Sequence, residues 1–148
     1  MTLEEFLVGL PAVRIVGGSP LYQPTVLPEY SISINGFRTG AYAAAINNRR
    51  EDFARAKGFK RVLVPNPHQN DYVGGIFPDG KYPLPSGLEH APTTCFSLLI
   101  ICEAVSVKKV ELFGVCGWAS KWHDGDWEMH YIKRHMPNVT VHDPRPPW

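Results

Sequence analysis

The chain has 148 residues, of which 44% are hydrophobic and 20% are charged, a composition typical of one globular domain. Its formal net charge of +1 provides no basic excess, so we expect no nucleic-acid partner. The apolar run at residues 6–10 follows two glutamates and is too short for a membrane span or a signal segment. The three cysteines form no C-x-x-C pair, so we expect free thiols, no metal site and a cytoplasmic, reducing location.

Four elements are predicted in the first half of the chain. Val13–Val16 is rich in β-branched residues and runs into a Gly-Gly-Ser-Pro turn, which predicts a strand. Tyr30–Asn35 alternates with period two and stops at a glycine, which predicts a second strand. Ala41–Lys57 consists mostly of good helix formers and is followed by glycine, so we expect a helix there. Arg61–Val64 predicts a third strand, broken by the following prolines.

The second half begins with a long connection. Residues 68–91 are rich in glycine and proline and have no clear period, so we expect a lid over a binding site. The apolar stretch from Pro92 to Val105 predicts a buried helix, and Val110–Val115 predicts a strand. Gly125–His135 is acidic early and basic late, which favours a helix, and Val139–Val141 predicts a final strand.

Strands that alternate with helical segments indicate an α/β fold. We expect a doubly wound, mainly parallel, Rossmann-like sheet in a single three-layer α/β/α domain spanning residues 1–148. In such sheets ligands bind at the carboxyl ends of the strands. The candidate binding residues at or just after the carboxyl ends of predicted strands are Gly17, Gly18, Ser19, Asn35, Asn66 and Gly114.

Two further segments carry side chains suited to chemistry. Thr93 and Thr94 place hydroxyls at the start of an apolar helix, which favours an anion site but is equally typical of ordinary capping. His123 precedes a helix whose first turn is acidic and includes Glu128, so its imidazole could titrate near neutrality as a general base must. A surface histidine beside acidic residues is the simpler reading of the same pattern.

These segments resemble motifs of the animal-type sialyltransferases. Pro92-Thr93-Thr94-Cys95, the apolar helix and the strand that ends in Phe113-Gly114 are similar to the short sialylmotif. The very short motif of the family is a histidine followed, after four residues, by a glutamate. His123 and Glu128 have this spacing and are similar to it. The beginning of the long motif is matched only in outline, at residues 16–19 and at residue 35.

The resemblance implies an inverting glycosyltransferase without metal or other cofactor. The donor would be a CMP-activated acid sugar, sialic acid or a related keto-acid such as Kdo, and the acceptor a hydroxyl of a glycan or small molecule. By this carry-over Ser19 and Asn35 would hold the nucleotide, Thr93, Thr94 and Cys95 would line its ribose and phosphate, and His123 would be the base. We expect the second catalytic residue, Glu128, to orient the helix start or to hydrogen-bond nearby backbone.

An alternative function remains open on the same residues. Residues 115–122 contain no His-Tyr or Tyr-Tyr pair, although the family's third motif lies between the short and very short motifs. The missing pair fits a CMP-binding module, that is, a chain that kept the nucleotide pocket but lost the transfer activity.

Overall fold

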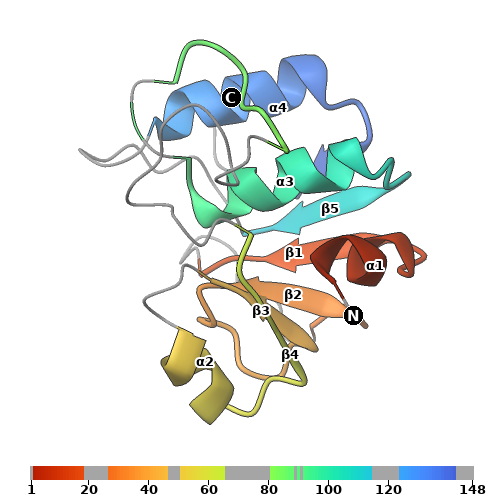
Figure 1. Ribbon diagram of the computed structural model, residues 1–148, viewed down its shortest axis with the longest axis vertical. Coiled ribbons are helices and arrows are strands. Elements are labelled where there is room, and N and C mark those ends of the chain that lie inside the picture. Colours follow the sequence, from red (N-terminus) through yellow and green to blue (C-terminus); the bar gives the residue numbers. More distant parts are fainter. Residues whose placement is uncertain are drawn as a thin grey trace.

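Six parallel strands pair into one sheet in the order β4-β3-β2-β1-β5-β6 (Figure 1). The computed structural model describes residues 2–18, 27–46, 51–65, 81–88, 90, 92–114 and 124–142. In chain order the elements are α1 (Leu3–Val8), β1 (Val13–Val16), β2 (Ser31–Ile34), β3 (Ala43–Ala45), α2 (Glu51–Ala56), β4 (Arg61–Leu63), α3 (Thr94–Ala104), β5 (Val110–Phe113), α4 (Gly125–His135) and β6 (Val139–Val141). This parallel sheet with flanking helices confirms the expected Rossmann-like α/β fold.

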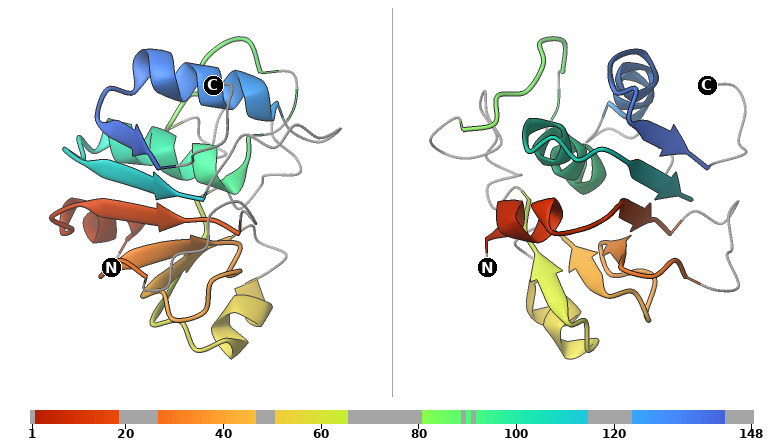
Figure 2. Two further views of the ribbon diagram at one scale, coloured as in Figure 1. Left: turned by 180° about the vertical axis from the view of Figure 1, so that it is seen from behind. Right: turned by 90° about the vertical axis from the view of Figure 1, so that its right-hand side faces the viewer.

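Helices flank both faces of the sheet. α1 and α3 lie on one face, and α4 runs beside α3 (Figures 1 and 2). Ala43 and Ala45 of β3 belong to the large core on that side, whereas Ala44 packs with Ala54 of α2. Since neighbouring residues of a strand point to opposite faces, α2 covers the second face at this end of the sheet.

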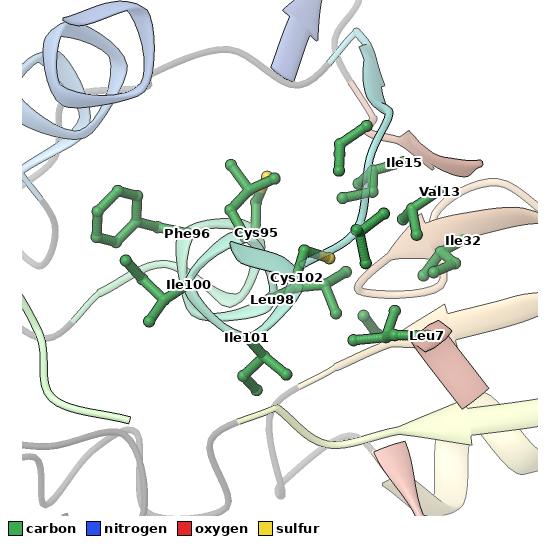
Figure 3. Close-up of a cluster of buried hydrophobic side chains, with 14 of the residues drawn as sticks. Leu7, Val13, Ile15, Ile32, Cys95, Phe96, Leu98, Ile100, Ile101 and Cys102 are labelled. Carbon is green, nitrogen blue, oxygen red and sulfur yellow. The ribbon is translucent and has the colours of Figure 1, made fainter. Parts of the chain in front are cut away.

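The large core lies between the strands and α3. Every residue of α3 from Thr94 to Cys102 is buried, as expected for a helix enclosed on several sides. Leu98 and Cys102 lie on the side of α3 nearest the strands, whereas Phe96 points to the other side (Figure 3). The strand residues that alternate into this core include Val13, Ile15, Ile32, Ile34, Val110 and Leu112.

The predicted helix from Ala41 to Lys57 is wrong over its first part. Ala43–Ala45 forms β3, which pairs with β2 on one side and β4 on the other, and the helix covers only Glu51–Ala56. Alanine favours helix in isolation, but pairing with two strands outweighs a propensity worth only tenths of a kcal/mol per residue. Residues 35–42 therefore connect two neighbouring parallel strands without a helix.

The remaining elements lie close to their predicted positions, apart from one that was not predicted. Gly125–His135 and Val139–Val141 have the expected bounds, and α3 and β5 fall inside theirs. α1 has a capping box, in which the Thr2 hydroxyl accepts from the Glu5 N–H and the Glu5 carboxylate accepts from the Thr2 N–H. The T-x-x-E spacing is the sequence signal for this helix.

Candidate functional site

The strand order reverses between β1 and β5. From β1 the chain moves to β2, β3 and β4 on one side, then returns to β5 and β6 on the other. In open α/β sheets the crevice at such a reversal, at the carboxyl ends of the strands, is the usual ligand site. Gly17 follows β1, Gly114 follows β5, and the Gly17 N–H donates to the Phe113 carbonyl at 2.9 Å. The predicted glycines Gly17 and Gly114 therefore lie at the carboxyl ends of the two paired strands where the order reverses.

Two side chains from the β2–β3 connection reach the end of β1. The Arg38 guanidinium donates through Nε to the Gly17 carbonyl at 3.3 Å, and the Arg38 N–H donates to the Ser33 hydroxyl at 2.9 Å. The Phe37 ring lies so close to Gly18 that a Cβ there would approach it to 3.0 Å, and the ring is 59% exposed. The sequence analysis missed Phe37 and Arg38, because nothing in the local pattern tells where this connection runs.

Asn35 holds a special position at the end of β2. Its φ of 55° lies in the left-handed region, which asparagine tolerates better than most residues. Its N–H donates to the Ala45 carbonyl at 2.8 Å. Its side-chain Oδ1 is buried and has no hydrogen-bond partner among the described residues. A buried acceptor without a partner is uncommon, and a ligand donor at this edge would satisfy it.

The start of α3 is occupied by contacts within the protein. Thr93 is the N-cap, and its hydroxyl accepts from the Phe96 N–H at 3.1 Å. Thr94 and Cys95 are both buried. Burial raises the pKa of the Cys95 thiol well above its ordinary value, so the thiol is protonated at neutral pH. Among the three predicted residues here, Thr93 alone is only partly buried.

The Glu128 carboxylate joins the start of α3 to the first turn of α4. It accepts from the Thr93 N–H at 3.0 Å and from the Thr93 hydroxyl at 2.5 Å, and its residue is only 4% exposed. Burial raises the pKa of Glu128 to about 7, against the opposing effect of the two Thr93 hydrogen bonds. A carboxylate at a helix N-terminus is also favoured by the helix dipole. Glu128 thus holds the start of α3 against the first turn of α4.

A second link runs parallel to the first. The Asp124 carboxylate accepts from the His90 N–H at 2.9 Å and lies 2.8 Å from His90 Nδ1. Together with the Glu128 contact, it ties the segment that leads into α3 to the segment that leads into α4. The two segments that resemble the short and very short sialylmotifs are therefore held side by side at the carboxyl edge.

Part of the predicted lid packs on the helices. The Tyr82 hydroxyl and the Lys81 ammonium both donate to the Glu4 carboxylate of α1, at 2.7 and 2.9 Å. At the other end of this stretch a Cβ on Gly87 would lie 2.9 Å from Nε1 of Trp127. The rest of the lid, except residue 90, lies outside the described residues, as do the predicted site residues Ser19, Asn66 and His123.

The described residues contain no cluster of three or more His, Cys, Asp or Glu side chains that could hold a metal ion. Within the same part of the chain, no helix is both long and apolar enough to cross a membrane. Comparison with protein-family models, with curated proteins and with solved structures finds no match.

Proposed function

We propose that this chain binds a CMP-activated acid sugar at the carboxyl edge of its sheet and transfers the sugar to an acceptor hydroxyl. The observation that carries the proposal is the pair of hydrogen bonds between Glu128 and Thr93. These bonds join two segments, far apart in sequence, that separately resemble motifs of one enzyme family. The sugar would be sialic acid or a related keto-acid such as Kdo.

In the proposed complex the nucleotide lies across the ends of β1 and β5. Gly17, Gly18 and Gly114 let the backbone approach it closely, and Asn35 holds it from the end of β2, where its side-chain Oδ1 has no partner among the described residues. Ser19 and Asn66 follow β1 and β4 in the sequence and would complete this edge. Thr93, with Thr94 and Cys95 behind it, forms the wall beside the phosphate.

The proposed reaction is one displacement with inversion. His123 removes the proton from the acceptor hydroxyl as that oxygen forms its bond to the anomeric carbon. The bond between this carbon and the phosphate oxygen breaks, and its electron pair leaves with CMP. Glu128 touches Thr93 rather than the reacting atoms, so we assign it a positioning role.

A binding module without transfer is the second candidate function. Residues 115–122 lack the aromatic and histidine pair that helps to bind the donor phosphate in the family that the chain resembles. In addition, the Thr93 hydroxyl already donates to Glu128 and accepts from Phe96, which limits what it can offer a phosphate.

Calorimetry with CMP, UMP and AMP tests the nucleotide site. We expect CMP to bind most tightly, and Asn35→Asp to weaken it about tenfold or more, because a carboxylate beside the nucleotide would repel its phosphate. Asn138→Asp is the matched control, since Asn138 is exposed at the opposite edge of the sheet. Equal affinities for the three nucleotides, or equal effects of the two variants, would contradict the proposed site.

A transfer assay separates the two candidate functions. His123→Ala should lower the rate of transfer by about 10²–10⁴-fold and leave CMP affinity within a few-fold, because a base acts on the acceptor. If wild-type protein binds CMP but neither transfers nor hydrolyses any CMP-sugar, the binding-module function replaces the enzyme.

A further inference from the structure

A groove of about 530 Å³ runs along the outer face of α4, beside Pro85 and Ser86. The five α4 side chains that line it, Trp127, His130, Tyr131, Arg134 and His135, follow the i, i+3, i+4, i+7, i+8 spacing of one helix face. The volume falls within the range of small-molecule and cofactor sites. The proposed nucleotide and transfer residues are not among those that line this groove.

Aromatic rings form a row along the groove. The Trp127 and Tyr131 rings stack at 5.2 Å with an interplanar angle of 18°, and the Tyr131 and His135 rings lie 4.7 Å apart. Phe96 meets Trp127 edge-on at 5.8 Å, and the close approach of Gly87 fixes the indole from another side. Rigid aromatic side chains offer large contact areas at a small cost in conformational entropy. Contacts with Phe96, Tyr131 and Gly87 thus surround the Trp127 indole.

The Arg134 guanidinium in the groove favours an anion. His130 and His135 also line the groove, and no carboxylate is among its lining residues in the described part of the chain. A guanidinium binds a carboxylate with two parallel hydrogen bonds, which gives both affinity and orientation. Lys133 is exposed on the same helix but is not among the lining residues.

The shape of the groove favours a short chain of sugar rings over a nucleic acid. From Trp127 to His135 the helix rises by about 12 Å, enough for several linked rings. A single guanidinium in a chain of net charge +1 also gives little attraction for a phosphate backbone.

From these observations we infer that the α4 groove binds an oligosaccharide that carries carboxylate groups. Its Trp127 end lies in the first turn of α4, one residue before Glu128, so a bound chain would extend toward the carboxyl edge. This assignment rests on the proposed function, in which the bound oligosaccharide is the acceptor of the transferred sugar.

Calorimetry with three probes of similar length tests this inference. The probes are a hyaluronan tetrasaccharide, which carries carboxylates, chitotetraose, which is neutral, and the oligonucleotide dT4, which is anionic but has no sugar chain with exposed ring faces. We expect measurable binding of the hyaluronan tetrasaccharide alone. Equal binding of chitotetraose or of dT4, or no binding of any probe at millimolar concentration, would overturn the inference.

Two variants with the same loss of charge locate the binding. Arg134→Gln should weaken the hyaluronan tetrasaccharide about tenfold or more, whereas Lys133→Gln should change its affinity less than about twofold. Both residues are exposed, so neither change should impair folding, and equal thermal midpoints would verify this. Equal effects on affinity would place the ligand elsewhere.

Titration of the same proteins with CMP separates this inference from the proposed function. Arg134→Gln should bind CMP like wild type. A wild-type protein that binds the tetrasaccharide but not CMP would refute the nucleotide site and leave the groove intact, and the reverse result would refute only the groove.

Discussion

The two faces of the sheet are built from different side chains, although the same strands supply both. On the face covered by α1 and α3, β1 and β5 contribute only apolar residues to the core, such as Ile15 and Leu112. On the other face the alternate residues of these strands include Arg14 and Glu111, which form an ion pair with 3.6 Å between Arg14 Nε and Glu111 Oε2. Hydrophobic burial is the main favourable term in folding, whereas partly exposed ion pairs contribute little. The first face therefore carries most of the stability.

The polar face nevertheless has an ordered network. Glu111 lies 3.8 Å from the Lys109 ammonium and 3.3 Å from His142 Nε2. The His142 ring stacks on Phe113 at 4.6 Å, at the carboxyl ends of β6 and β5. The comparison shows that the face covered by α1 and α3 stabilises the fold. The polar groups on the opposite face of β1 and β5 contribute little to stability, so they can change without unfolding the protein.

Neighbouring residues of β5 give the largest expected contrast. Leu112→Ala should lower the free energy of unfolding by about 2–5 kcal/mol, because Leu112 is fully buried and a cavity would remain. Glu111→Ala on the opposite face should cost about 1 kcal/mol or less. Urea denaturation of both variants measures the two losses. Similar losses would mean that the polar face is as important for stability as the core.

Titration of Glu128 should produce the next largest effect, since this residue joins the two helices α3 and α4. Its pKa is raised from 4.5 to about 7 in the folded protein, so the folded state holds the proton more tightly than the unfolded state. The contribution of Glu128 to stability is then fully present below pH 4.5 and is lost as pH rises from 4.5 through 7, by up to about 3 kcal/mol.

Glu128→Gln should abolish most of this pH dependence, because the amide does not titrate. Denaturant midpoints between pH 4 and 8 measure it, and Asp126→Asn, an exposed carboxyl in the same helical turn, is the control that should retain the slope. A wild-type slope that persists in Glu128→Gln would assign the titration to another group.

Two serines of β2 sharpen the comparison within the polar face. The Ser33 hydroxyl accepts from the Arg38 N–H, whereas the buried Ser31 hydroxyl has no partner among the described residues. Ser33→Ala should therefore cost about 1 kcal/mol, and Ser31→Ala should be neutral or slightly stabilising. Thermal unfolding of the two variants checks the order, and the reverse order would contradict these contacts.

Glu4 should give the smallest effect, at the rim of the apolar face. Hydrogen bonds from Lys81 and Tyr82 lower the pKa of Glu4 from 4.5 to about 2, so its contribution is present above pH 4.5 and is lost as pH falls toward 2. Partial exposure of the pair limits this contribution to less than about 1 kcal/mol.

Glu4→Gln should reduce stability at pH 7, with the difference from wild type shrinking toward pH 2. Glu29→Gln, at an exposed carboxyl, should show no such trend in the same denaturation series. A difference that grows on acidification would give the opposite sign and exclude the proposed cause.

The sequence was sufficient for elements whose local pattern agrees with their final environment. The apolar run at α3 and the charge order of α4 specify these helices locally. β3 could not be predicted in the same way, because Ala43–Ala45 becomes a strand only through its pairing with Ile32 to Ile34 and with Arg61 to Leu63. Long-range pairing overrides local propensity there.

The candidate site was predictable where it depends on topology. Parallel strands end at one edge, so Gly17, Asn35 and Gly114 could be placed at the carboxyl ends from the order of elements alone. The contacts of Phe37 and Arg38 with the end of β1 depend on the course of a connection without secondary structure. No periodicity encodes such a course, so these residues emerge only from the structure.

The position of β1 at the centre of the sheet has a consequence for how the chain is made. β1 pairs with β2 soon after it in the chain, but its other neighbour is β5, with Val13 opposite Val110. Contacts so distant in sequence slow folding, and an unpaired strand edge invites association with other chains. During synthesis, the edge of β1 that pairs with β5 stays without its partner strand until β5 has left the ribosome. Protection of that edge is therefore a late event in the biogenesis of this protein.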